Sequence, residues 1–294
     1  MFDLKQYLTA KKRQINQALI ALFPKEDSPR IVEAMQYSLM ADGKRVRPIL
    51  CLAAAEAVGG NPDDAIGPAC ALEMVHTYSL IHDDLPGMDN DELRRGKPTL
   101  HVAYDEATAI LAGDALLTFA FEILTAESKH TLPDSVRLCV VQALARAAGH
   151  RGMIEGQMRD LAAEGQVLDL TELKALHGKK TGALIKSALH IGALIGGGKP
   201  NQIDALQDFG ENIGLAFQIV DDNLNVVGDP DIIGKATGTD ASRQKSTYPA
   251  LLGLDQARAM ARESIGRALQ AITAFDRRAD PLRALAAYII ERKR

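Results

Sequence analysis

The chain of 294 residues has a formal net charge of −4 at pH 7 and a pI near 6.0, which argues against a nucleic-acid-binding surface. Hydrophobic residues make up 47% and charged residues 24%, a balance that supplies a large core and disfavours intrinsic disorder. Aromatic residues are scarce at 4%, whereas the strong helix formers alanine and leucine are abundant, which disfavours a β-sandwich.

Apolar residues recur with helical spacing along almost the whole chain. The first predicted helix contains Leu4 and Leu22 and ends before Pro24. No period-two alternation bounded by hairpin turns appears, and no linker rich in proline, glycine and serine divides the series. We therefore expect an all-α protein with a single domain, residues 1–294. The further predicted helices are 31–40, 46–58, 65–85, 107–126, 135–148, 152–165, 171–195, 203–227, 250–275 and 281–292.

The cysteines and the N-terminus indicate the compartment. Cys51, Cys70 and Cys139 lie far apart, are odd in number and form no CxxC pair, which argues for a reducing compartment. We expect them to be small core residues of a cytoplasmic protein. The N-terminus lacks the apolar segment of a signal peptide. The most apolar stretch, 107–121, is too short to span a membrane and contains Asp114, so no membrane span is expected.

The first acidic cluster stands where the predicted helix 65–85 ends. A Pro-Gly turn follows Asp83 and Asp84 and can bring Asp89 back toward Asp83. Carboxylates at a helix C-terminus oppose the helix dipole, so their presence there favours a functional role over a solvated helix end. Clustered carboxylates without cysteine suit hard cations, Mg²⁺ before Zn²⁺.

A second acidic cluster lies near the end of the predicted helix 203–227. Gln218, Asp221, Asp222 and Asn225 fall at i, i+3, i+4 and i+7 and share one helical face. A polar stripe on an apolar helix must face water, a partner or a ligand. With the first cluster in the same chain, a ligand is favoured.

Basic residues gather in the segments that interrupt the helices. Lys44 and Arg47 lie three apart at a predicted helix start, a place suited to an anion. His76 lies two helical turns before Asp83 and is either a phosphate donor or an ordinary helix histidine. Diphosphate fits such a chain because arginine forks and Mg²⁺ both bind its oxygens. No GxxxxGK[ST] or GxGxxG motif points to a nucleotide. The other basic clusters are Arg94 with Arg95, Lys179 with Lys180, and Lys235 with Lys245.

Together these motifs resemble those of the trans-isoprenyl diphosphate synthases, and most closely the bacterial farnesyl diphosphate synthases (geranyltranstransferases). Gly-Lys-Arg-x-Arg-Pro, Asp-Asp-x4-Asp with Arg-Arg after it, Lys-Thr-Gly-Ala-Leu and Phe-Gln-x-x-Asp-Asp stand in that family's order. The resemblance implies an isoprenoid-synthase-type helical bundle around a deep central cavity, forming a homodimer. It also implies Mg²⁺-dependent condensation of isopentenyl diphosphate with dimethylallyl or geranyl diphosphate to give farnesyl diphosphate.

The resemblance implies roles for individual residues, and three Mg²⁺ ions per active site when substrate is bound. The implied metal ligands are Asp83, Asp84, Asp89, Asp221 and Asp222. The isopentenyl diphosphate site matches Gly43, Lys44, Arg47, His76 and Arg95, and the allylic diphosphate site matches Arg94, Lys180, Thr181, Gln218, Lys235 and Lys245. The residues expected to act in catalysis itself are Asp83, Asp84, Arg94, Lys180 and Gln218.

The second acidic motif departs from the family pattern at its last position. The family has an aspartate there, whereas Asn225 brings an amide oxygen without charge, so the occupancy of the nearest metal site is an open point. The C-terminal segment 291–294, in which three basic residues follow Glu291, resembles the family's basic tail that closes over isopentenyl diphosphate. A synthase of longer chains, such as geranylgeranyl diphosphate, is the leading alternative. A terpene cyclase would not need the basic isopentenyl site, and a non-catalytic regulatory subunit would lack the first acidic motif.

Tyr78 and Ser79 precede Asp83 by five and four residues. At a rise of 1.5 Å per residue, Tyr78 lies roughly 7–8 Å along the helix from the metal end. An aromatic ring at that depth can form the floor of a cavity and stop elongation at fifteen carbons; ordinary core packing is the plainer alternative. The farnesyl diphosphate synthases that the chain resembles carry an aromatic residue at this position and the same two extra residues in the first acidic motif.

Overall fold

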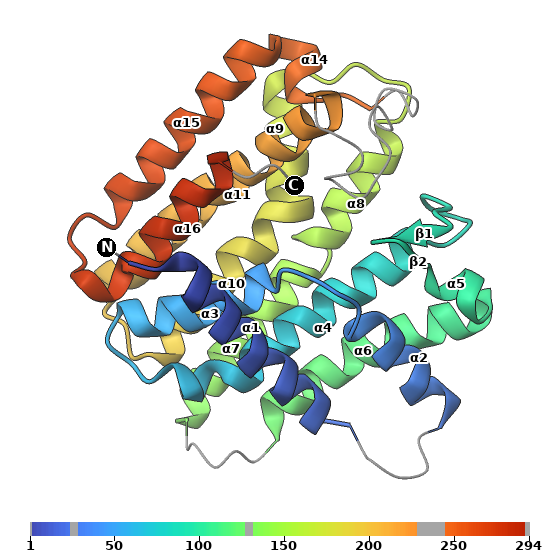
Figure 1. Cartoon of the computed structure of the whole chain (residues 1–294), viewed down its shortest axis with the longest axis horizontal. Helices are drawn as coiled ribbons and strands as arrows, with labels where there is room; N and C mark the ends of the chain where they lie inside the picture. Colours follow the sequence, from blue (N-terminus) through green and yellow to red (C-terminus); the bar gives the residue numbers. More distant parts are fainter. Residues whose placement is uncertain (1, 24–28, 127–131, 228–244, 292–294) are drawn as a thin grey trace.

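The computed structural model describes residues 2–23, 29–126, 132–227 and 245–291. Within these stretches the chain forms a bundle of helices with one small two-stranded hairpin (Figure 1), which confirms the all-α prediction. The longer helices are α1 (Leu4–Ala21), α2 (Arg30–Leu39), α3 (Val46–Ala57), α4 (Ile66–Asp83), α6 (Glu106–Thr125), α7 (Asp134–Ala148), α8 (Met153–Ala162), α9 (Leu170–His177), α10 (Ala183–Ile195), α11 (Pro200–Val227), α15 (Leu254–Ala271) and α16 (Asp280–Glu291). The shorter elements are η1 (Pro62–Ala65), β1 (Leu93–Arg94), β2 (Lys97–Pro98), α5 (Leu100–Ala103), η2 (Gly178–Gly182), α14 (Tyr248–Leu252) and η3 (Arg277–Ala279).

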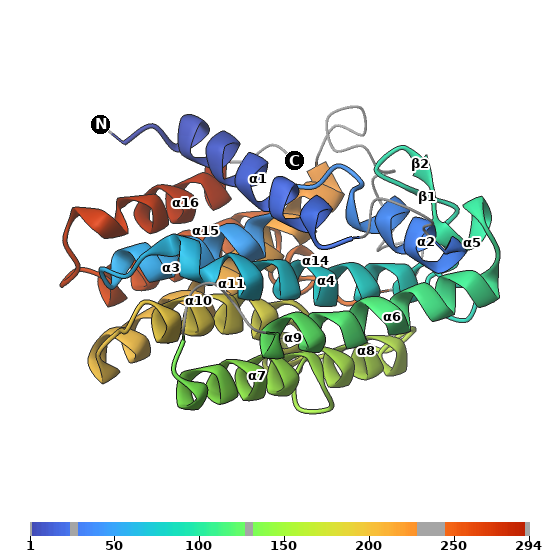
Figure 2. The same ribbon diagram turned by 90° about the horizontal axis from the view of Figure 1, so that it is seen from below.

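The helices α3, α4, α10 and α11 form the centre of the bundle because their apolar residues continue around much of each helix. Helix α3 packs against α4 and α10, and α10 packs against α11. Helix α6 covers α4, while α15 covers α11. Figure 2 shows α1 and α16 on one side of this centre and α7 and α8 on the other. At Gly192 of α10 a side chain would collide with the Cys51 carbonyl of α3, so glycine allows these two helices to approach closely.

The structure differs from the predicted elements at three places. The predicted helix 171–195 is divided by η2, a π-helix of five residues whose wider turn displaces the side chains that follow α9. The predicted helix 250–275 is divided at Gly253, whose φ of 78° no α-helix accommodates. The hairpin β1–β2 was not predicted, since strands of two residues carry no period-two pattern.

The hairpin is closed by Arg95 and Gly96, both with positive φ, of 55° and 75°. A two-residue loop of this conformation matches the twist of paired strands. The hairpin follows directly on the first acidic cluster and lies beside α2 and α5 (Figure 1).

The structure shows where the three cysteines and the most apolar helix lie. Cys51 and Cys70 are buried as predicted, but Cys139 is exposed on α7, so it is not a core residue. Among the described residues α6 is the one helix long and apolar enough to cross a membrane by length and composition. One face of α6 packs against α4, as in a core helix, and the opposite face leaves Ile110 and Leu111 exposed.

A buried ion pair shapes the loop before α3. Arg45 has a φ of 53° and turns its guanidinium inward, where Nη1 donates to Glu73 Oε1 of α4 at 2.7 Å. Its Nη2 donates to the Leu39 carbonyl at 2.7 Å, and its Nε donates to Asn16 Oδ1 at 2.9 Å. Both members of the pair are almost fully buried. The pair therefore fixes the loop to the central helices.

We expect Glu73→Leu to lower the free energy of unfolding by about 3–5 kcal/mol, because it leaves the Arg45 charge buried without its carboxylate. The double variant Arg45→Met/Glu73→Leu should recover part of this loss. Urea unfolding measures both. The control is Glu211→Gln, which removes the exposed pair between Glu211 and Lys186 (2.9 Å) and should change stability by less than about 1 kcal/mol. A loss from Glu73→Leu as small as that of the control would contradict this role.

Candidate active site

The first acidic cluster folds back on itself as predicted. The Asp89 N–H donates to the Asp83 carbonyl at 2.8 Å, and the Asn90 N–H donates to the Leu85 carbonyl at 3.1 Å. Asn90 has a φ of 51°, a conformation that asparagine tolerates better than most residues. The turn therefore returns Asp89 to the end of α4, next to Asp83.

The carboxylates of this turn carry unfavourable charge. Burial raises the pKa of Asp83 to about 6, with further increases from Asp89 and Asp84 and opposing effects from Lys180 and Arg94. A cation bound here would relieve that cost. Among the described residues no three His, Cys, Asp or Glu side chains gather into a complete metal cage. Mg²⁺ does not need one, because it ordinarily takes one or two protein carboxylates and completes its shell with phosphate and water.

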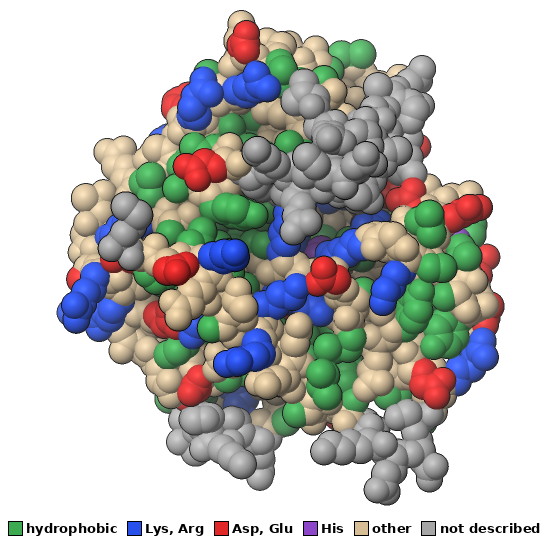
Figure 3. All heavy atoms as spheres, in the orientation of Figure 1, with side chains coloured by type: hydrophobic (Ala, Val, Ile, Leu, Met, Phe, Trp, Pro, Cys, Tyr) green, Lys and Arg blue, Asp and Glu red, His purple; other side chains and the backbone are tan. Residues whose placement is uncertain are grey.

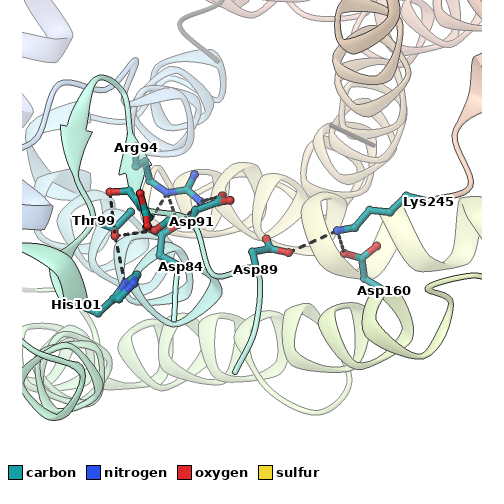
Figure 4. Close-up of polar contacts among 9 residues, drawn as sticks. Asp84, Asp89, Asp91, Arg94, Thr99, His101, Asp160 and Lys245 are labelled. Carbon is teal, nitrogen blue, oxygen red and sulfur yellow. Dashed lines mark hydrogen bonds and ion pairs between the residues drawn. The ribbon is translucent and has the colours of Figure 1, made fainter. Parts of the chain in front are cut away.

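Asp84 is buried and holds Arg94 of the hairpin (Figure 4). Arg94 Nε donates to Asp84 Oδ2 at 2.8 Å and Nη2 donates to Oδ1 at 2.5 Å. Burial raises the pKa of Asp84, and the guanidinium opposes that rise. The Thr99 hydroxyl donates to the Asp91 carbonyl at 2.7 Å and closes the base of the hairpin. Asp84 is thus bound to an arginine, whereas Asp83 and Asp89 lie at the turn.

Two lysines meet on a single carboxylate of α8. Lys180 Nζ of η2 lies 2.6 Å from Asp160 Oδ2, and Lys245 Nζ lies 3.0 Å from the same oxygen. Lys245 Nζ also lies 3.7 Å from Asp89 Oδ1, which connects this group to the first acidic cluster (Figure 4). Although burial raises it, the two lysines hold the pKa of Asp160 below its usual value. A side chain at Gly156 would collide with the Lys180 backbone, so this glycine lets η2 lie against α8.

In the second acidic cluster one carboxylate, Asp222, is buried and the other, Asp221, is exposed. Asp222 is buried; it accepts from Gln218 Nε2 at 2.9 Å and from the Tyr248 N–H at 3.1 Å. The Thr181 hydroxyl donates to Gln218 Oε1 at 3.1 Å. Asp221 is exposed on the same helix. The predicted polar stripe therefore joins η2, α11 and α14 through Gln218 and Asp222, and Asp221 is the carboxylate of the pair that reaches the surface.

The charges of several arginines act on His76 of α4. Burial lowers the pKa of His76 well below its usual value, and the charges of Arg47 and Arg95 lower it further. Burial also lowers the pKa of Arg47. Arg95 Nη1 donates to the Asp42 carbonyl, which brings the hairpin against the loop that carries Gly43; a side chain at Gly43 would collide with Arg95. The positive charge near the uncharged His76 would favour the binding of an anion.

Lysine and arginine side chains lie across the middle of the face drawn in Figure 3, interspersed with acidic ones. Lys44 is exposed and lies at an apolar pocket of about 210 Å³ between α1, α3, α11 and α16, where Val46, Leu50 and Phe217 are among the lining residues. This pocket is not lined by Tyr78. The predicted site residue Lys235 and the end of the C-terminal tail, 292–294, lie outside the described residues.

Tyr78 is buried, with 5% of its surface exposed, and burial raises its pKa to about 12. No described group lies within hydrogen-bonding distance of its hydroxyl. The Ser79 hydroxyl donates to the His76 carbonyl at 2.8 Å, so its hydrogen bond stays within α4. Tyr78 thus presents its ring rather than a polar contact.

Sequence reasoning left three features of this site unassigned. Asp160 stands in an ordinary helical pattern, and only folding brings the lysines of η2 and the segment before α14 to it. Arg45 belongs to the basic motif 43–48, but its left-handed backbone turns it into the core. His82 directly precedes Asp83 and packs against α6.

Comparison with known proteins agrees with this geometry. The family model for polyprenyl synthetase matches residues 28–282. The chain is 47% identical to a farnesyl diphosphate synthase of Geobacillus stearothermophilus over 290 residues, 98% of this chain and 96% of the relative. It is also 47% identical to a chloroplastic geranylgeranyl pyrophosphate synthase of Capsicum annuum over 293 residues, 99% of this chain and 79% of the relative. The crystal structure of an FPP/GFPP synthase from Zymomonas mobilis superposes with a TM-score of 0.86 at 42% identity and covers 98% of both chains.

His177 is the last residue of α9, and its ring centroid lies 5.4 Å from that of Tyr248. Burial lowers its pKa from 6.5 to about 4. Between these values the unfolded chain binds a proton that the folded protein excludes, so folding stability is lost as pH falls from 6.5 to 4.

We therefore expect His177→Phe to lose less stability than the wild type between about pH 6.5 and pH 4.5, since phenylalanine binds no proton. The measurement is urea unfolding of both proteins across this range. Curves that fall in parallel would contradict the assignment.

Proposed function

Because the chain belongs to the polyprenyl synthetase family and is a trans-prenyl diphosphate synthase, we propose that it joins isopentenyl diphosphate to dimethylallyl and then geranyl diphosphate, releasing farnesyl diphosphate. One observation carries the proposal: cations lie against the acidic turn. Lys180 and Lys245 meet on Asp160 beside Asp89. A second group of cations, Arg47 and Arg95, lies near the uncharged His76 of α4.

In this proposal the allylic diphosphate binds at the turn of the first acidic cluster. Lys180 and Lys245 transfer their hydrogen bonds from Asp160 to the diphosphate oxygens, and Arg94 stays oriented by Asp84. Thr181 and Gln218 border this site. Asp83, Asp89 and Asp221 would hold Mg²⁺, which when bound neutralises the diphosphate and favours its departure. Asp222 supports Gln218 from behind.

Isopentenyl diphosphate would bind between the hairpin and the loop before α3. Lys44, Arg47 and Arg95 supply positive charge, and the uncharged His76 supplies a hydrogen bond. As the allylic C–O bond breaks, the double bond of isopentenyl diphosphate attacks the allylic carbon. The released diphosphate then accepts a proton from the carbon next to the resulting cation, and the new double bond forms there. Apolar walls would exclude water that would otherwise trap the carbocation.

We also propose a cytoplasmic homodimer. The exposed face of α6 supports the assembly, since the neighbouring residues Ile110 and Leu111 are exposed on it. Adjacent exposed apolar residues are the kind of surface that a partner covers. A second copy covering this face would bury them. The free thiols of the three cysteines suit a reducing compartment.

Fifteen carbons are favoured over twenty by the Tyr78 ring, which is bulky, buried and lies on α4 before Asp83. The relatives include synthases of fifteen-carbon and of twenty-carbon products, so the proposed product length rests on Tyr78 rather than on the relatives. A non-catalytic subunit is disfavoured by the intact first acidic cluster, since such a subunit has no use for Asp83 and Asp89 held at one turn.

We expect Asp83→Ala to lower kcat by about three orders of magnitude or more, because the site would lose both charge neutralisation and the positioning of the diphosphate. EDTA should abolish wild-type turnover, and Mg²⁺ should restore it. Steady-state diphosphate release measures both effects. Glu211→Gln, at an exposed ion pair with Lys186, is the control. Near-normal rates for Asp83→Ala, or activity that persists in EDTA, would overturn the proposed mechanism.

We expect Tyr78→Ala to extend the products to twenty carbons or more, because removal of the ring deepens the cavity by roughly one isoprene unit. Chromatography of the dephosphorylated products gives the chain length. Tyr78→Phe is the matched control and should keep fifteen carbons, since the hydroxyl makes no described hydrogen bond. Clean production of farnesyl diphosphate by Tyr78→Ala would show that another group forms the floor.

A further inference from the structure

His82 lies one turn beyond Tyr78 on α4 and has no role in the proposed chemistry. The two rings stand edge to face, with centroids 5.6 Å apart and planes at 81°. His82 Nε2 donates to the Ile110 carbonyl of α6 at 3.1 Å. One side chain thus contacts both the ring of Tyr78 and the backbone of a neighbouring helix.

The His82 ring lies directly against the Gly113 backbone of α6. A Cβ at this position would collide with Nε2 and Cδ2 of the His82 ring. Gly113 lies in the middle of α6, where glycine costs helix stability relative to alanine. Position 113 is therefore glycine because the His82 ring occupies the space that a side chain there would need. The ring is clamped between the Gly113 backbone on one side and Tyr78 on the other.

We propose that His82 is a positioning residue that fixes the Tyr78 ring and thereby limits product length, an inference that rests on the proposed function. Tyr78 has no hydrogen bond of its own among the described residues, so packing alone holds its ring in place. His82 supplies an edge-to-face partner and is itself anchored by the Ile110 carbonyl.

The group that anchors His82 is the backbone carbonyl of Ile110 on α6. Ile110 and its neighbour Leu111 belong to the exposed face of α6 that a second copy would cover in the proposed dimer. Asp114 Oδ1 lies 3.9 Å from Nε2 and is largely exposed, so the carbonyl rather than this carboxylate is the main anchor.

The test compares product lengths for His82→Ala, His82→Gln and Gly113→Ala, with dimethylallyl and geranyl diphosphate as starters. His82→Ala removes the ring, His82→Gln keeps a donor for Ile110 without the ring, and Gly113→Ala displaces the ring. Each should raise the fraction of products with twenty or more carbons by about three- to tenfold, the effect expected from loss of one aromatic contact. KM for isopentenyl diphosphate should change less than about threefold, because no substrate contact is removed. His190→Ala on α10 is the control and should leave product length unchanged.

A second comparison asks whether His82 acts through Tyr78. In the Tyr78→Ala background, His82→Ala should produce no further lengthening, since the ring that it positions is gone. Unchanged product length in all three single variants, or full additivity in the double variant, overturns the inference. If His82→Ala does not fold, His82→Gln and Gly113→Ala decide the question. A wild-type enzyme that makes no farnesyl diphosphate overturns the proposed function instead, so the two failures are distinguishable.

Discussion

The structure depends on the repulsion between carboxylates that meet at the end of a buried helix. Asp83, Asp84 and Asp89 lie within one turn, and burial raises the pKa of Asp83 to about 6. A helix C-terminus adds its own negative dipole to this charge. Such a cluster persists only if cations compensate it. The Arg94 fork on Asp84 and Lys245 near Asp89 supply part of that compensation, and bound metal would supply the rest.

The same constraint explains why the basic residues are held by acidic partners in the protein without substrate. Lys180 and Lys245 would repel one another at a common site, but Asp160 accepts from both and keeps them there. Arg95, by contrast, is held by a backbone group, the Asp42 carbonyl. Diphosphate would therefore meet cations whose positions are already set, so little conformational entropy would be lost on binding. Buried salt bridges add little to stability by themselves, so their value here lies in positioning.

Much of the fold could be predicted from the sequence. Helical periodicity, and the glycine and proline residues at which helices end, are determined by residues that are close together in the chain. The turn that returns Asp89 to Asp83 was predictable for the same reason. The π-helix η2, the hairpin and the Asp160 anchor were not, since each depends on packing between distant segments. Arg45 is the clearest case: it stands between the predicted anion ligands Lys44 and Arg47 and had no predicted role, yet its backbone conformation makes it an internal partner of Glu73.

The central claim is that the carboxylates and the cations form one site, in which metal and diphosphate bind together. Calorimetric titration of the wild-type protein with inorganic pyrophosphate, in excess Mg²⁺ and in EDTA, tests this without turnover. The account predicts binding about 10- to 100-fold tighter with Mg²⁺, a coupling typical of ligands that share a site. Equal affinity in the two conditions would contradict it, because the lysines and arginines alone would then hold the diphosphate.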